Sequence, residues 1–200
     1  MERIEKQFDP MTSKIFKDNN GYTQLHFAAK VGDLETCKKF VHLLKEKDCN
    51  GRTAMHIASI KGNYDIVEYF FETDKSVLKE TDVEGWTPLL IAARNGHAKI
   101  CELLMTEGYS EKDNDGDTAL HLAMSTGING SNYEVCKLFV GLKKEKNKSE
   151  QTPIVMAIGK GYKDVVELLT SKEDHMENLK TEVEVLQKQI DKVKLLAEKI

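Results

Sequence analysis

Apolar and polar positions follow the same order five times along the 200-residue chain. In each copy a polar turn leads to a threonine, and a short run of small apolar residues follows at helical spacing. The five runs are Thr23–Ala29, Thr53–Ser59, Thr87–Ala93, Thr118–Met124 and Thr152–Ile158. Self-similarity at an interval of about 30 residues predicts a solenoid of stacked helical units, in contrast to a globule with a single core.

Each copy predicts a turn followed by two helices. Turns such as Asp18 to Gly21 combine aspartate, which bonds nearby backbone, with glycine, which accepts positive φ. Threonine is a favoured N-cap, and Pro88 and Pro153 occupy the first helical position, where no N–H is needed. The first helix is expected to end in left-handed caps at the aligned glycines, which are Gly32, Gly62, Gly96, Gly127 and Gly161. A second helix then carries apolar residues at helical spacing, for example Ile100, Cys101, Leu103 and Leu104.

The order D-x-x-G-x-T-P-L-H-x-A-A-x-x-G resembles the ankyrin repeat between about Asp18 and Thr170. The resemblance implies an all-α solenoid of helix-turn-helix units with β-hairpin or turn loops, whose hairpins and first helices form a concave face. We therefore expect a repeat domain over 18–173, with repeats near 18–47, 48–81, 82–112, 113–146 and 147–173. Residues 1–17 are predicted to form a capping segment, with Ile15 and Phe16 in a helix.

Residues 174–200 differ in kind, because their apolar residues alternate in steps of three and four. This heptad pattern predicts a long coiled-coil helix that makes a homodimer through Leu179, Val183, Leu186, Ile190, Val193 and Ile200. The alternative is that the helix folds back over Ile154 or Val155 and Ile158 of the last repeat.

The charge of the chain restricts its partners. A net charge of −4 from 29 basic and 33 acidic residues provides no bulk attraction for nucleic acid or an anionic membrane, and neither partner is expected. The longest apolar runs are far too short to span a bilayer, and no signal-peptide segment is present at Met1. We expect a soluble cytoplasmic protein, with the nucleus as an alternative.

Cysteine and histidine positions favour structural roles. Cys37, Cys101 and Cys136 share one register with Val67 and Val166, which predicts a small buried apolar site and reduced thiols. Cys49 lies in a turn and is expected to be exposed. His26, His56 and His121 are distributed along the stack, and the ankyrin resemblance implies that each binds the capping threonine region and ties repeats together. Nothing converges as a catalytic, metal or cofactor site requires, so no enzyme activity is predicted.

The concave face carries the candidate binding residues. The resemblance places Tyr22, Arg52 and Trp86 on hairpins and Lys30, Lys61 and Arg94 on first helices, whereas Glu84, Asp115 and Asp117 make later hairpins acidic. Trp, Tyr and Arg are enriched at interface hot spots. The prediction is an adaptor or scaffold whose groove binds a protein partner with an acidic segment. The alternative is the regulatory N-terminal region of a larger enzyme, such as a kinase or a ligase adaptor.

Overall fold

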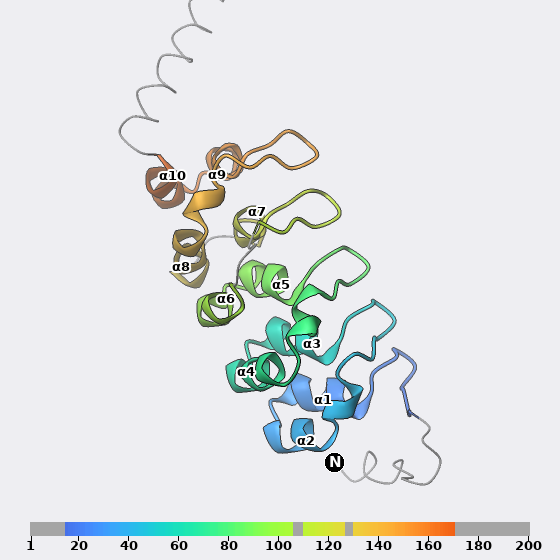
Figure 1. Cartoon of the computed structure of the whole chain (residues 1–200). Coiled ribbons are helices and arrows are strands. Elements are labelled where there is room, and N and C mark those ends of the chain that lie inside the picture. The colour runs from blue at the N-terminus through green and yellow to red at the C-terminus, as the bar shows by residue number, and fades with distance from the viewer. Residues whose placement is uncertain (1–14, 106–109, 127–129, 171–200) are drawn as a thin grey trace, which may run out of the picture.

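The computed structural model describes residues 15–105, 110–126 and 130–170, and these residues form paired helices (Figure 1). The pairs are α1 (Gln24–Val31) with α2 (Leu34–Lys39), α3 (Ala54–Lys61) with α4 (Tyr64–Thr73), α5 (Pro88–Arg94) with α6 (Ala98–Leu104), α7 (Ala119–Ala123) with α8 (Gly130–Leu138), and α9 (Pro153–Lys160) with α10 (Lys163–Leu169). Short 3-10 helices follow three of the pairs and are η2 (Val41–Leu43), η3 (Lys75–Lys79) and η4 (Val140–Leu142). The prediction of an all-α array of helix pairs is confirmed.

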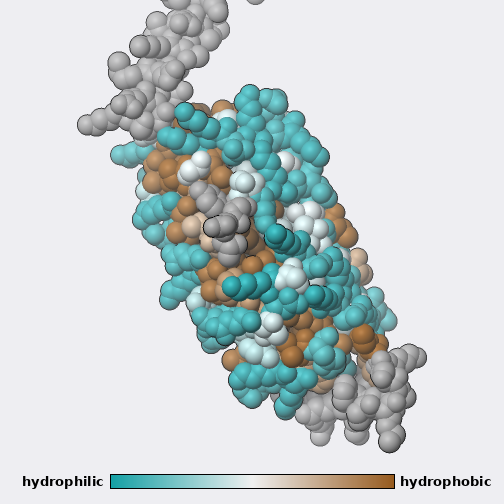
Figure 2. All heavy atoms as spheres, in the orientation of Figure 1, coloured by the Kyte–Doolittle hydropathy of each residue, from teal (hydrophilic) through white to brown (hydrophobic). Residues whose placement is uncertain are grey.

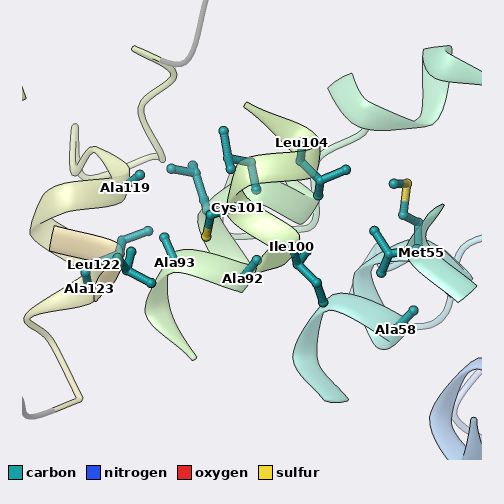
Figure 3. Close-up of a cluster of buried hydrophobic side chains, with 14 of the residues drawn as sticks. Met55, Ala58, Ala92, Ala93, Ile100, Cys101, Leu104, Ala119, Leu122 and Ala123 are labelled. Carbon is teal, nitrogen blue, oxygen red and sulfur yellow. The ribbon is translucent and has the colours of Figure 1, made fainter. Parts of the chain in front are cut away.

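The pairs stack into two layers (Figure 1). The first helices lie side by side along the middle of the array, the second helices form an outer layer, and the loops between pairs project to the opposite side. Small residues on the first helices, such as Ala58, Ala92 and Ala123, let neighbouring backbones approach closely. Larger side chains from the second helices, including Ile100 and Leu104, fill the space between the layers (Figure 3).

Local chemistry sets both ends of the first helices. Thr23, Thr53, Thr87, Thr118 and Thr152 are the N-caps, all with extended backbone. Gly32, Gly62 and Gly161 are left-handed C-caps, and Gly96 also has positive φ. Three of the five predicted caps are therefore confirmed, α5 is capped by Asn95 with Gly96 one residue later, and Gly127 lies outside the described residues.

The loops are turns closed by an aspartate in the first four repeats and by Asn147 in the fifth. In the second repeat Asp48 Oδ1 accepts hydrogen bonds from the N–H groups of Asn50 and Arg52, each at 2.8 Å, while Asp48 N–H donates to Arg52 O at 2.9 Å. In the part of the chain that the structure covers, no named strand forms, and the nearest approach to one is a single antiparallel bridge between Lys112 and Thr118. The β-hairpins that the resemblance implies are reduced here to turns, because the carboxylate satisfies the backbone groups that a strand pair would use.

The expectations for the two ends of the chain concerned a capping helix and a coiled coil. Ile15 and Phe16 do not form a helix, and Ile15 is 42% exposed, so the predicted capping helix is wrong at these two residues. Residues 1–14 and the predicted coiled coil at 174–200 lie outside the described residues.

Cys37, Cys101 and Cys136 are fully buried free thiols, as predicted, and burial raises the pKa of Cys101 to about 12.

The close approach of successive turns makes Gly21 sensitive to substitution. Its φ is 78°, and an added Cβ would lie 2.9 Å from Cys49 N. We expect Gly21→Ala to lower the free energy of unfolding by about 1–3 kcal/mol, the usual cost of a strained backbone conformation. Gly159→Ala is the matched control, because no atom lies within 4 Å of its Cβ position in α9. That change should stabilise by up to about 1 kcal/mol through helix propensity. Urea titrations in which both variants lose equal stability would contradict this account.

Candidate functional site

The residues predicted to bind a partner at the hairpins also tie neighbouring repeats together. Arg52 Nε donates to Asp82 Oδ2 at 3.3 Å, and Trp86 Nε1 donates to Asp113 Oδ2 at 2.8 Å. Both carboxylates are buried, so an unpartnered oxygen there would be costly. Arg52 and Trp86 are half-buried in consequence, and neither is a free anchor on an open surface.

The residue after the turn glycine makes a different contact with the next turn at each junction. In the fourth repeat Asp117 Oδ1 accepts from Asn147 Nδ2 at 2.8 Å, so donor and acceptor are reversed where asparagine replaces the turn aspartate. Tyr22 makes no corresponding bond and instead stacks on His26, with ring centroids 5.4 Å apart. Asp48 Oδ2 is therefore a buried oxygen without a hydrogen-bond partner at the first junction.

Arg94 is held by an aromatic contact. Its guanidinium carbon lies 4.3 Å from the centre of the Trp86 ring, in cation–π geometry. Among the residues that the structure describes, no carboxylate forms an ion pair with this guanidinium. Trp86 therefore has two structural roles, because its N–H binds Asp113 and its ring orients Arg94.

Lys30, Lys61 and Arg94 form a row that we call the basic row. They lie in the last turns of α1, α3 and α5, which are stacked neighbours. Lys61 is exposed and has no ion-pair partner in the described ranges, and Lys30 is exposed with its ammonium 5.8 Å from the Tyr22 ring centre. Each cation also stabilises the negative end of its own helix dipole.

The row stops after the third repeat. In the fourth repeat Thr126 Oγ1 donates to Arg94 O at 2.9 Å, and no cation occupies that end of α7. In the fifth repeat Lys160 Nζ donates to Met124 O at 2.9 Å and to Ser125 O at 3.1 Å, so its ammonium is occupied within the array. Unpaired positive charge on this side is concentrated on the first three repeats.

The three aligned histidines have the structural role that the resemblance implies. His56 Nδ1 accepts from Thr53 N–H at 3.1 Å, so its Nε2 carries the proton and donates to Glu80 O and Trp86 O, at 3.0 and 3.1 Å. His26 and His121 make the same arrangement with Arg52 O and Gln151 O. Burial lowers the pKa of all three imidazoles, and that of His56 to about 4.

The third repeat has Leu90 at the histidine position, and another bond takes over there. Thr87 Oγ1 donates at 2.9 Å to Oε2 of Glu111, which lies just before the turn that begins the fourth repeat. The junction therefore keeps a polar tie although the imidazole is absent.

Sequence reasoning missed a set of lysine clamps. The lysine just before the turn aspartate reaches the next repeat, where its Nζ contacts a glutamate and the carbonyl that follows it. The clamps are Lys17 with Glu46 and Lys47 O, Lys47 with Glu80 and Thr81 O, and Lys112 with Glu145 and Lys146 O. The recurring Glu-Lys-Asp at Glu46–Asp48 and Glu111–Asp113 was the available signal.

Comparison with known proteins agrees with this geometry. A family model described as "Ankyrin repeats (3 copies)" matches residues 6–81, 72–140 and 111–182. The chain belongs to the ankyrin-repeat family. Within the described ranges, this ankyrin array contains no helix long and apolar enough to cross a membrane. Those ranges also contain no group of three or more metal-ligating side chains.

Curated relatives share part of the ankyrin array. The human transient receptor potential cation channel subfamily A member 1 is 32% identical over 117 residues, which cover 56% of this chain and 10% of the channel. Alpha-latrotoxin-Lg1a of Latrodectus geometricus is 33% identical over 117 residues, covering 54% of this chain and 9% of the toxin. The ankyrin array thus corresponds to about a tenth of the length of these relatives.

Proposed function

We propose that this ankyrin array is a non-enzymatic adaptor that binds an extended acidic segment of a partner protein along the basic row. Ankyrin repeats imply protein–protein interaction, which is the general basis of the proposal. The observation that carries the specific form is the alignment of Lys30, Lys61 and Arg94 on three stacked helices without carboxylate partners in the described part of the chain.

Arg94 is the central contact in this proposal. Its guanidinium is already oriented by the Trp86 ring, so less side-chain freedom is lost when a carboxylate binds. The planar fork of arginine matches a carboxylate with two parallel hydrogen bonds. Trp86 acts here by positioning Arg94, while Arg52 contributes less because Asp82 already engages it.

The geometry of the row indicates the spacing of the partner's charges. Stacked helices lie about 8–10 Å apart, and an extended chain advances about 3.3 Å per residue. An extended segment running along the array would therefore match successive cations with an acidic residue at about every third position. Lys30 and Lys61, which are exposed, would also accelerate association with an acidic partner.

Charge reversal tests this proposal. Lys61→Glu with Arg94→Glu is expected to weaken binding of a fluorescent peptide with glutamate at every third position by about 30-fold or more, since breaking charged contacts costs several kcal/mol. The measurement is fluorescence anisotropy at fixed ionic strength. A peptide of the same composition with its glutamates clustered should bind more weakly to the unmodified protein.

The matched control is Lys99→Glu with Lys144→Glu, which makes the same charge change at two exposed lysines outside the row. This control should leave affinity within about threefold, because an exposed charge that does not touch the partner contributes little to binding. If the two double variants lose the same affinity, the effect is one of net charge alone, and the basic row is not the binding site.

A further inference from the structure

The last repeat presents apolar residues where the inner repeats bury theirs. The third and sixth residues after the capping threonine face the following repeat, and in the first four repeats all are fully buried. They are His26, Ala29, His56, Ser59, Leu90, Ala93, His121 and Met124. The fifth repeat has Val155 and Ile158 at these positions, 51% and 60% exposed. Figure 2 shows hydrophobic atoms at this end of the array.

The identity of Val155 indicates what the surface contacts. His26, His56 and His121 use Nε2 to bind a carbonyl of the next repeat, whereas valine can make no such bond. A terminal repeat facing water requires a polar outer side. We call Val155 and Ile158, together with the half-buried Ile154 of α9 and Val166 of α10, the end face. Its composition suits an apolar occupant.

The chain leaves α10 in the manner of an inner repeat. Thr170 has extended backbone (φ −94°, ψ 116°), and Thr170 Oγ1 donates to Val166 O at 2.8 Å. At the end of α6, Met105 occupies the same register as Thr170, and its N–H donates to Cys101 O as the N–H of Thr170 donates to Val166 O. The helices that follow α6, which are α7 and α8, cover α5 and α6. The residues after Thr170 continue from the corresponding point of the last repeat.

We propose that residues 174–200 of the same chain cover the end face with their apolar stripe, formed by Leu179, Val183, Leu186 and Ile190. The stripe carries an apolar residue at every third or fourth position, as a helix lying on an apolar surface requires. Two partly exposed aliphatic side chains are far less than the roughly 800 Å² per partner of a stable interface. A tethered segment can still bind them, since its effective concentration is in the millimolar range. This proposal does not depend on the basic row.

The stripe cannot both cover the end face and form a parallel coiled coil. Experiments on the full-length chain can distinguish these two arrangements. Amide hydrogen exchange is measured on the wild type and on Leu179→Asp with Leu186→Asp. The double variant should accelerate exchange in α9 by about 10-fold or more while α7 exchanges as before, because covering lowers local opening. Light scattering should show a monomer for both proteins.

Two controls complete the test. Gln187→Asp with Gln189→Asp adds the same charge beside the stripe and should leave α9 exchange unchanged. Val155→Asp with Ile158→Asp changes only exposed side chains, so the array should stay folded while exchange in 174–200 accelerates. A wild-type dimer, or α9 exchange that is the same in the wild type and the Leu179→Asp, Leu186→Asp variant, would overturn the proposal.

Discussion

Replacement of Phe70 by alanine is expected to lower the free energy of unfolding by about 3–5 kcal/mol, the usual cost of a large cavity in a packed core. The Phe70 ring is fully buried in the last turn of α4, which packs between α2 and α6. Neighbouring repeats cannot collapse into the cavity without losing their own contacts. Urea unfolding followed by circular dichroism measures the loss.

The next residue in the chain supplies a control for this prediction. Phe71 is only half-buried, and the Lys75 ammonium lies 5.1 Å from its ring centre at the surface. Phe71→Ala makes the same chemical change with less burial, so it should cost markedly less than Phe70→Ala. If the two variants unfold at the same urea concentration, the assigned register of α4 is incorrect.

Acidification is expected to destabilise the array through its buried histidines, with His56 contributing about 3 kcal/mol. Burial lowers the pKa of His56 to about 4 in the folded state, while an unfolded chain keeps a value near 6.5. Between about pH 6.5 and pH 4, His56 binds a proton in the unfolded state but stays neutral in the folded state. The contribution is therefore fully present above pH 6.5 and is lost as the pH falls to about 4. His26 and His121 act in the same direction.

Comparison with a variant isolates this effect. Carboxylates such as Asp74, whose pKa is lowered to about 2 by its bonds with Ser76 and then by Lys45, add their own loss of stability at lower pH. His56→Leu introduces the residue that stands at position 90, and its stability should depend less steeply on pH between 6.5 and 4.5 than that of the wild type. His42→Gln, at an exposed histidine, is the control and should retain the wild-type slope. Parallel slopes for wild type and His56→Leu would show that His56 does not titrate as described.

Many features of the fold depend on chemistry within one repeat, and these were predictable. The capping threonines, the glycines at positive φ and the buried cysteines each follow from local backbone and packing preferences repeated five times. Repetition strengthened each inference, because an accidental pattern would not recur in register. The interpretation of the histidines held for the same reason, since the partner threonine lies only three residues away.

The candidate binding residues needed more than their position in the repeat. Trp86 and Arg52 were placed on the concave side, but their hydrogen-bond partners, Asp113 and Asp82, lie about 30 residues away in the next repeat. The partner-binding role of Tyr22, Arg52 and Trp86 stays a prediction, and their contacts within the array make a positioning role more direct. Arg94 is the more direct candidate for partner contact, because its guanidinium lies over the Trp86 ring and has no acidic partner among the described residues.

The sequence by itself determined the repeat period, the helix pairs and the caps. It did not distinguish Leu103 from Leu104, which are both apolar in the α6 pattern, although only Leu104 is buried. Tertiary structure decided that difference, together with the lysine clamps and the exposure of Val155 and Ile158. The physical reason is that burial and pairing in a stacked array depend on the adjacent repeat, and a single repeat's pattern does not specify which side that neighbour covers.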